Sequence, residues 1–156
     1  MPAQQLIHGI MVFLHDLATV IWVGGLVVLA AVVLPSVRSA TEKSAARQLM
    51  KAVQRRLSAL VYPSIVVLVV TGALLAKRET AFVSPFSFSN AYSATLAVKH
   101  LLVVLMIGIA LTRSAVLGRL EQSPGLERTK ATLLLANAGL GVIVLALSAA
   151  TAVIAS

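Results

Sequence analysis

Four long apolar stretches dominate the sequence and decide what this chain can fold into. They cover residues 6–34, 58–76, 94–111 and 131–155. The hydrocarbon core of a bilayer is about 30 Å thick, and an α-helix of about 20 apolar residues crosses it. Lipid offers no hydrogen-bond partners, so a spanning segment must pair its backbone groups internally. The sequence therefore predicts an all-α integral membrane protein, a four-helix bundle.

The composition excludes a water-soluble domain. Apolar residues make up 59% of the 156 residues and charged residues only 12%, whereas soluble domains are about half apolar and about a quarter charged. The segments between the apolar stretches are too short for a second domain, so we expect one transmembrane domain over residues 1–156. Residues 1–5 contain no Lys or Arg, so we expect the first stretch to stay in the mature protein rather than act as a cleaved signal.

The net charge of +8 is distributed unevenly among the loops. Only Lys77 and Arg78 lie between the second and third stretches. The other two loops share the opposite side and carry Arg38, Lys43, Arg47, Lys51, Arg55, Arg56, Arg113, Arg119, Arg128 and Lys130. Loops rich in Lys and Arg remain in the cytoplasm. We therefore predict a multi-pass protein of a bacterial inner membrane with both termini in the periplasm.

The first cytoplasmic loop has the pattern of an amphipathic helix over about residues 40–57. Ser39 and Glu42 have the spacing of a capping box, in which the two side chains cap a helix start. Apolar residues recur on one face of this helix, at Ala46, Leu49, Met50, Val53 and Leu57. We expect the helix to lie on the membrane with its basic face against anionic lipid. No motif supports nucleic-acid binding.

Aromatic residues gather in the external loop between the second and third stretches, at Phe82, Phe86, Phe88 and Tyr92. Two interpretations stay open. Aromatic side chains commonly form a belt at the membrane interface. The same residues would also suit a lid over a site that opens outward.

Five ionisable side chains lie inside the predicted helices, where charge is costly and often functional: His8, His15, Asp16, Lys99 and His100. His8 and His15 are two turns apart and share one stripe with Met11, Thr19 and Trp22. At about 1.5 Å per residue, His15 lies roughly 13 Å, and Lys99 and His100 roughly 8 to 9 Å, below the outer boundary. A site shared by His15 and His100 is therefore geometrically possible.

Imidazole groups facing each other across a bundle suit either copper or b-type haem. The chain has no cysteine, so a copper site would use His with Met. Its candidate ligands are His8, Met11, His15 and His100, and Met106 is a weaker candidate. Simpler explanations also exist. Lys99 can extend its amine to the interface, Asp16 can pair with Lys99 or a histidine, and His8 can be solvated.

Short motifs in the first and third stretches resemble the copper resistance protein D (CopD) family. They are Leu14-His15, Trp22-Val23-Gly24-Gly25-Leu26 with Pro35 at the helix end, and Val98-Lys99-His100-Leu101-Leu102. The resemblance implies a multi-helix membrane domain that takes part in copper uptake or handling.

The chain is also similar to HemJ-type protoporphyrinogen oxidases, which have four membrane helices. His15, seven residues before Trp22, and Lys99 in the third stretch match that pattern. This resemblance implies b-type haem binding by His15 with Lys99 or His100, and Trp22 nearby. The chain has Ala97 where that family has His, and it lacks the family's Arg and Tyr-His elements after the first helix.

Three hypotheses follow. The leading one is a CopD-like protein that binds copper near the outer face, with a periplasmic metal carrier or a second copy of the chain as its possible partner. The second is a haem-binding membrane oxidoreductase. The third is a structural membrane subunit without a cofactor. We favour a non-enzymatic role and assign no catalytic residue.

Overall fold

The computed structural model describes residues 3–78, 84, 86, 88–117, 119–120 and 123–155. Within these residues every regular element is helical. Four helical segments are long and apolar enough to cross a membrane, namely Ala3–Ser39, Lys43–Ala76, Ala91–Val116 and Pro124–Val153. The prediction of an all-α fold with four helices able to span a membrane is thus confirmed, by length and composition, for the described residues. The chain divides into two compact units, Met1–Glu79 and Thr80–Ser156, and each is described by itself.

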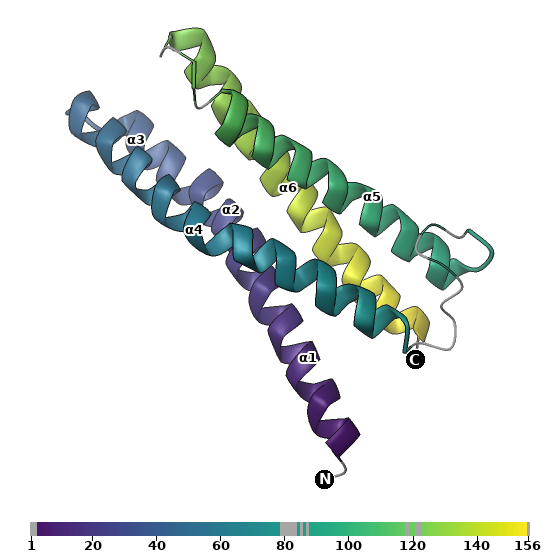
Figure 1. Cartoon of the computed structure of the whole chain (residues 1–156). Helices are drawn as coiled ribbons and strands as arrows, with labels where there is room; N and C mark the ends of the chain where they lie inside the picture. The colour runs from purple at the N-terminus through teal and green to yellow at the C-terminus, as the bar shows by residue number, and fades with distance from the viewer. Residues whose placement is uncertain are drawn as a thin grey trace. The chain divides into compact units, whose positions relative to one another are not determined.

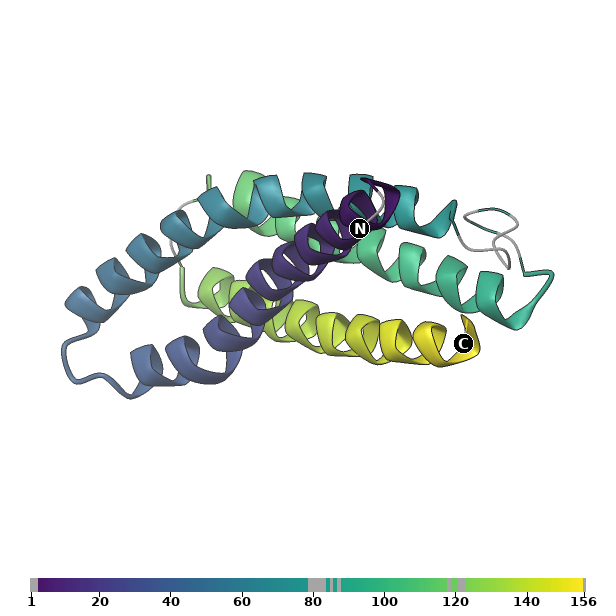
Figure 2. The same cartoon turned by 90° about the horizontal axis from the view of Figure 1, so that it is seen from below.

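The N-terminal unit is a helical hairpin. Its first arm runs through α1 (Ala3–Thr19), η1 (Val20–Gly24), α2 (Gly25–Val28), η2 (Leu29–Val33) and α3 (Leu34–Ser39). The second arm is α4 (Lys43–Ala76). Lys43 Nζ donates a hydrogen bond to the Arg38 carbonyl at 2.7 Å across the turn. Figures 1 and 2 show α1 crossing α4 obliquely. At the other end of the first arm, α3 contacts α4.

The two arms approach closely where the sequence has a glycine. A Cβ atom at Gly25 would lie 2.9 Å from Leu57 Cδ1, so a side chain there would displace Leu57. Small residues allow this kind of close helix packing in membranes.

The segments η1 and η2 are π-helical, with the wider turn that often marks functional sites.

The predicted surface helix over residues 40–57 is not a separate element. Residues 43–57 are helical, but they continue without a break into the span, so that α4 has 34 residues. The physical reason is that residues 55–60 contain no Gly or Pro to end the helix, and the helix even continues through Pro63. The predicted capping box is also wrong, because Glu42 makes no side-chain cap and the Ser39 hydroxyl instead donates to the Ser36 carbonyl at 3.1 Å.

The C-terminal unit is a second antiparallel helix pair. It contains α5 (Ala91–Leu111), η3 (Thr112–Val116) and α6 (Pro124–Ala155), and α5 and α6 lie side by side in Figures 1 and 2. The Asn90 side chain caps α5 by accepting the Ser93 N–H at 2.7 Å. Both helices are longer than the apolar stretches that predicted them, because polar residues extend each helix beyond the lipid core.

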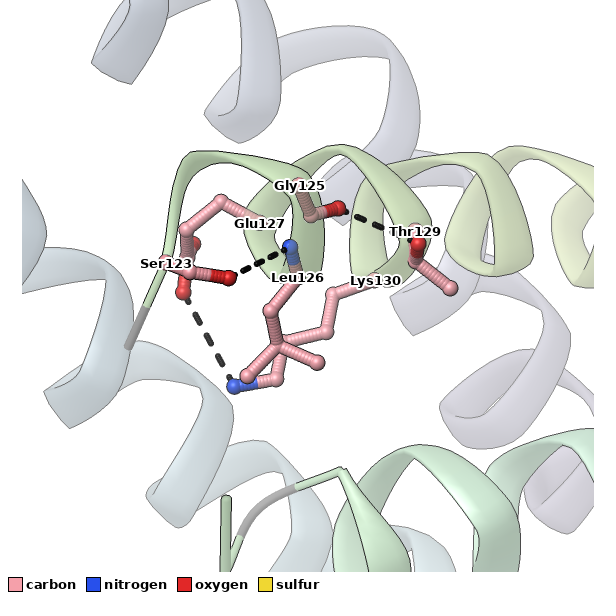
Figure 3. Close-up of polar contacts among 6 residues, drawn as sticks. All are labelled: Ser123, Gly125, Leu126, Glu127, Thr129 and Lys130. Carbon is pink, nitrogen blue, oxygen red and sulfur yellow. Dashed lines mark hydrogen bonds and ion pairs between the residues drawn. The ribbon is translucent and has the colours of Figure 1, made fainter. Parts of the chain in front are cut away.

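Polar contacts secure the start of α6, as Figure 3 shows. The Ser123 hydroxyl accepts the Leu126 N–H at 3.2 Å, and the Thr129 hydroxyl donates to the Gly125 carbonyl at 3.1 Å. Lys130 and Glu127 form an ion pair at 3.7 Å one turn into the helix. The Ser123 hydroxyl thereby supplies a partner to one of the N–H groups that the start of a helix otherwise leaves open.

Candidate functional site

His15 is the site residue for which the structure gives a contact between helices. It lies half-buried on α1, and its Nδ1 atom is 3.0 Å from the hydroxyl oxygen of Thr71 on α4. Thr71 is buried, with 6% of its surface exposed. The two side chains therefore make a polar contact between the arms of the N-terminal hairpin, inside segments suited to cross a membrane.

The other residues of the His15 stripe differ in exposure. Met11, one turn before His15, is half-buried, whereas His8 is exposed together with the rest of residues 3–10. Trp22 is 1% exposed in the π-helical segment η1, and its indole N–H has no hydrogen-bond partner among the described residues. Asp16 is exposed on α1. The stripe is thus most buried at Trp22 and open at His8.

In the C-terminal unit, Lys99 and His100 are half-buried on α5. The ring centroids of His100 and Phe86 are 6.3 Å apart, and the two rings are tilted by 60° relative to each other. The loop before α5 thus contributes an aromatic ring beside His100. Phe82, the first aromatic residue of that loop, lies outside the described residues. Met106, further along α5, is fully buried.

His15 and His100 belong to different units, so a site shared between them stays a prediction. Within the described residues, no group of three or more His, Asp or Glu side chains is arranged to hold a metal ion. Met11 is the nearest sulfur donor to His15 along the chain.

The sequence interpretation missed Thr71. It is one of several hydroxyl residues in the spans, and most of these bond to a carbonyl four residues earlier in their own helix. Thr19, Ser64 and Thr151 do so at 2.8 Å each. Nothing in the local pattern separates Thr71 from them. Its neighbour Gly72 was the available signal, because a glycine inside a span marks close packing.

A comparison with protein families shows which family this chain belongs to. The model of the copper resistance protein D family matches residues 51–151, well over half of the chain. The chain belongs to the copper resistance protein D family. This confirms the resemblance, and it makes the protein a multi-pass membrane member of a family linked to copper resistance. No curated protein and no solved structure gives a significant match.

The family match covers most of α4 and all of α5 and η3, and it continues to Thr151 of α6. Lys99 and His100 therefore lie inside the copper resistance protein D region. His8, Met11, His15 and Trp22 precede it. Thr71 is inside the match, so the hydrogen bond to His15 connects the matched region to α1.

This copper resistance protein D chain also buries an unusual amide. Asn137 on α6 is fully buried, and neither its amide nitrogen nor its oxygen has a partner among the described residues. An unpaired amide transferred from water to an apolar medium costs roughly 2–7 kcal/mol.

We expect Asn137→Leu to raise the thermal unfolding midpoint of the purified protein, because an apolar side chain of similar size removes that cost. Thermal unfolding in detergent measures this, and Leu135→Ala at an exposed position of the same helix serves as the control. A lower midpoint in Asn137→Leu than in the wild type would show that the amide has a stabilising partner.

Proposed function

We propose that this protein binds copper within the membrane near its outer face, through His15 and His100 with His8 and Met11 assisting, for copper uptake or handling. Copper is the cargo in this proposal. The observation that carries it is the interhelical contact of His15 with Thr71, which orders an imidazole inside a spanning segment. Membership of the copper resistance protein D family supports copper as the metal.

The residues present fit a soft, low-coordinate metal ion. Imidazole suits copper and zinc, whereas thioether sulfur favours Cu(I). Met11 lies one turn from His15 on α1, so the two side chains occupy neighbouring positions on one helix face. The chain has no cysteine, which leaves methionine as its source of sulfur. This donor set supports Cu(I) over metals that require several carboxylate ligands.

Binding and delivery fit the residues better than transport through a pore. The candidate ligands in both units lie toward the periplasmic ends of the predicted spans, and a periplasmic metal carrier would be the matching partner. In the proposed orientation the exposed Lys43, Arg47, Lys51 and Arg55 form a basic ladder at the cytoplasmic end of α4. Anionic lipid headgroups would complement that ladder.

One observation favours b-type haem as the second candidate. The indole N–H of Trp22 is buried without a partner among the described residues, and a donor in that state suits an acceptor group on a bound cofactor. In this alternative His15 with Lys99 or His100 would supply the axial ligands.

Metal and haem analysis of the protein in mild detergent separates the candidates. After expression with both copper and haem precursors, we expect stoichiometric copper and no Soret band. His15→Ala should weaken Cu(I) binding by about 100-fold or more, because it removes the ligand itself, whereas loss of a partner that only orients a ligand costs about 10- to 100-fold. Met50→Leu, which replaces a methionine outside the proposed site, should bind as the wild type does.

His100→Ala and the double variant add a second test. A single shared centre predicts that either histidine variant loses the same copper, whereas separate sites predict that each loses only part. A Soret band that disappears in His15→Ala would contradict the copper proposal. Absence of both copper and haem would favour the structural subunit.

The orientation has its own test. A reporter that is active only in the periplasm, fused after Ser156, should be active, because the basic loops hold the opposite side in the cytoplasm. A fusion within the turn at Ala40–Glu42 should be inactive and serves as the control. The reverse result would overturn the orientation and the outward-facing site.

A further inference from the structure

We propose that Thr71 and Gly72 are positioning residues, which hold the His15 ring with its proton on Nδ1 so that Nε2 carries the lone pair. The hydrogen-bonding part of this inference depends only on the hairpin of the N-terminal unit. Its consequence for copper rests on the proposed function.

The direction of the hydrogen bond follows from the partners of Thr71. A threonine hydroxyl has one proton to donate. The Thr71 oxygen lies 2.7 Å from the Val67 carbonyl in its own helix, with the Leu68 carbonyl further away at 3.4 Å. A carbonyl can only accept, so the hydroxyl proton points to α4's own backbone. Toward His15 the Thr71 oxygen is therefore the acceptor, and Nδ1 at 3.0 Å is the donor.

This direction selects one form of the ring. A neutral imidazole with a proton on Nδ1 carries its lone pair on Nε2, and the reverse holds for the other tautomer. Metal-binding histidines commonly donate their second ring N–H to a neighbouring acceptor, which orients the ring and raises the basicity of the coordinating nitrogen. Thr71 supplies that acceptor to His15 from the opposite helix.

Gly72 provides the space for the ring. A Cβ atom at this position would lie 3.2 Å from His15 Cε1 and 3.7 Å from Nδ1. The first distance is tighter than an ordinary van der Waals contact, so a side chain at residue 72 would require the His15 ring to shift by a few tenths of an ångström from its present position. Thr71 and Gly72 are adjacent on α4, and together they fix both the hydrogen bond and the position of the ring edge.

The chain contains a matched control. The Thr95 hydroxyl donates to the Ala91 carbonyl at 2.8 Å, which is the same bond within a helix that Thr71 makes to Val67. Thr95→Val thus removes a helix back-bond alone. Thr71→Val removes both the back-bond and the acceptor for His15, and Thr71→Ser keeps the hydroxyl. The comparison separates the contact with His15 from general effects on helix stability.

The direct test is nitrogen NMR of the metal-free protein with ¹⁵N-labelled histidine, where the His15 signals are assigned by their loss in His15→Ala. We expect the wild type, Thr71→Ser and Thr95→Val to show a proton on Nδ1. In Thr71→Val the ring should shift toward the other tautomer, since its Nδ1–H loses the acceptor. A wild-type ring protonated on Nε2, or a Thr71→Val spectrum identical to that of the wild type, would overturn the proposal.

Copper binding provides a second readout. Thr71→Val should weaken Cu(I) binding about 10- to 100-fold, which is the usual range for loss of a hydrogen-bond partner that orients a metal ligand. Gly72→Ala should weaken it as well, whereas Thr71→Ser and Thr95→Val should not. Thermal unfolding of each variant verifies that it is folded.

The two readouts distinguish the possible failures. A tautomer set by Thr71 in a protein that binds no copper would sink the proposed function and leave the positioning role intact. The opposite result would be a loss of copper in His15→Ala, with neither the copper binding nor the tautomer changed in Thr71→Val. That result would contradict the positioning role and leave the proposed function intact.

Discussion

The absence of water from the lipid core is the constraint on which the rest of the structure depends. A polar group in a spanning segment is costly without a partner within the protein, and helices supply such partners for the backbone. The hydroxyl groups of Thr19, Ser64 and Thr151 find partners by bonding to carbonyls of their own helices. Thr71 does the same and, in addition, accepts a bond from His15. An imidazole is thereby held between two membrane helices.

The same constraint explains how much of the fold the sequence could predict. The length of the apolar stretches alone located all four helices that are long and apolar enough to cross a membrane. A helix of about 20 apolar residues is what a bilayer core requires. Helix ends were less accessible. Residues 43–57 are basic and amphipathic rather than apolar, yet they belong to the same helix as the span that follows them. Charged residues mark where the lipid-facing part of a helix ends, but they do not end the helix itself. The predicted boundary at residue 58 therefore followed the lipid core rather than the backbone.

For the candidate site, spacing along one helix was informative and pairing between helices was not. The 3.6-residue period placed His8, Met11, His15 and Trp22 on one stripe of the first helical arm, along which Met11 and His15 are half-buried and Trp22 is buried, whereas His8 is exposed. The partner of His15 lies 56 residues away in sequence, and no local pattern identifies such a residue. The family match covers Thr71 but not His15. The hydrogen bond between them thus joins the part of the chain that matches the family to α1, which carries three of the four proposed copper ligands, His8, Met11 and His15.

The central claim is that His15 is a copper ligand supported by methionine sulfur, and X-ray absorption spectroscopy of the Cu(I)-loaded protein tests it most directly. The account predicts both imidazole nitrogen and sulfur around the copper, with the imidazole contribution reduced in His15→Ala and the sulfur lost in Met11→Leu. A copper environment of nitrogen and oxygen alone, unchanged by His15→Ala, would contradict it.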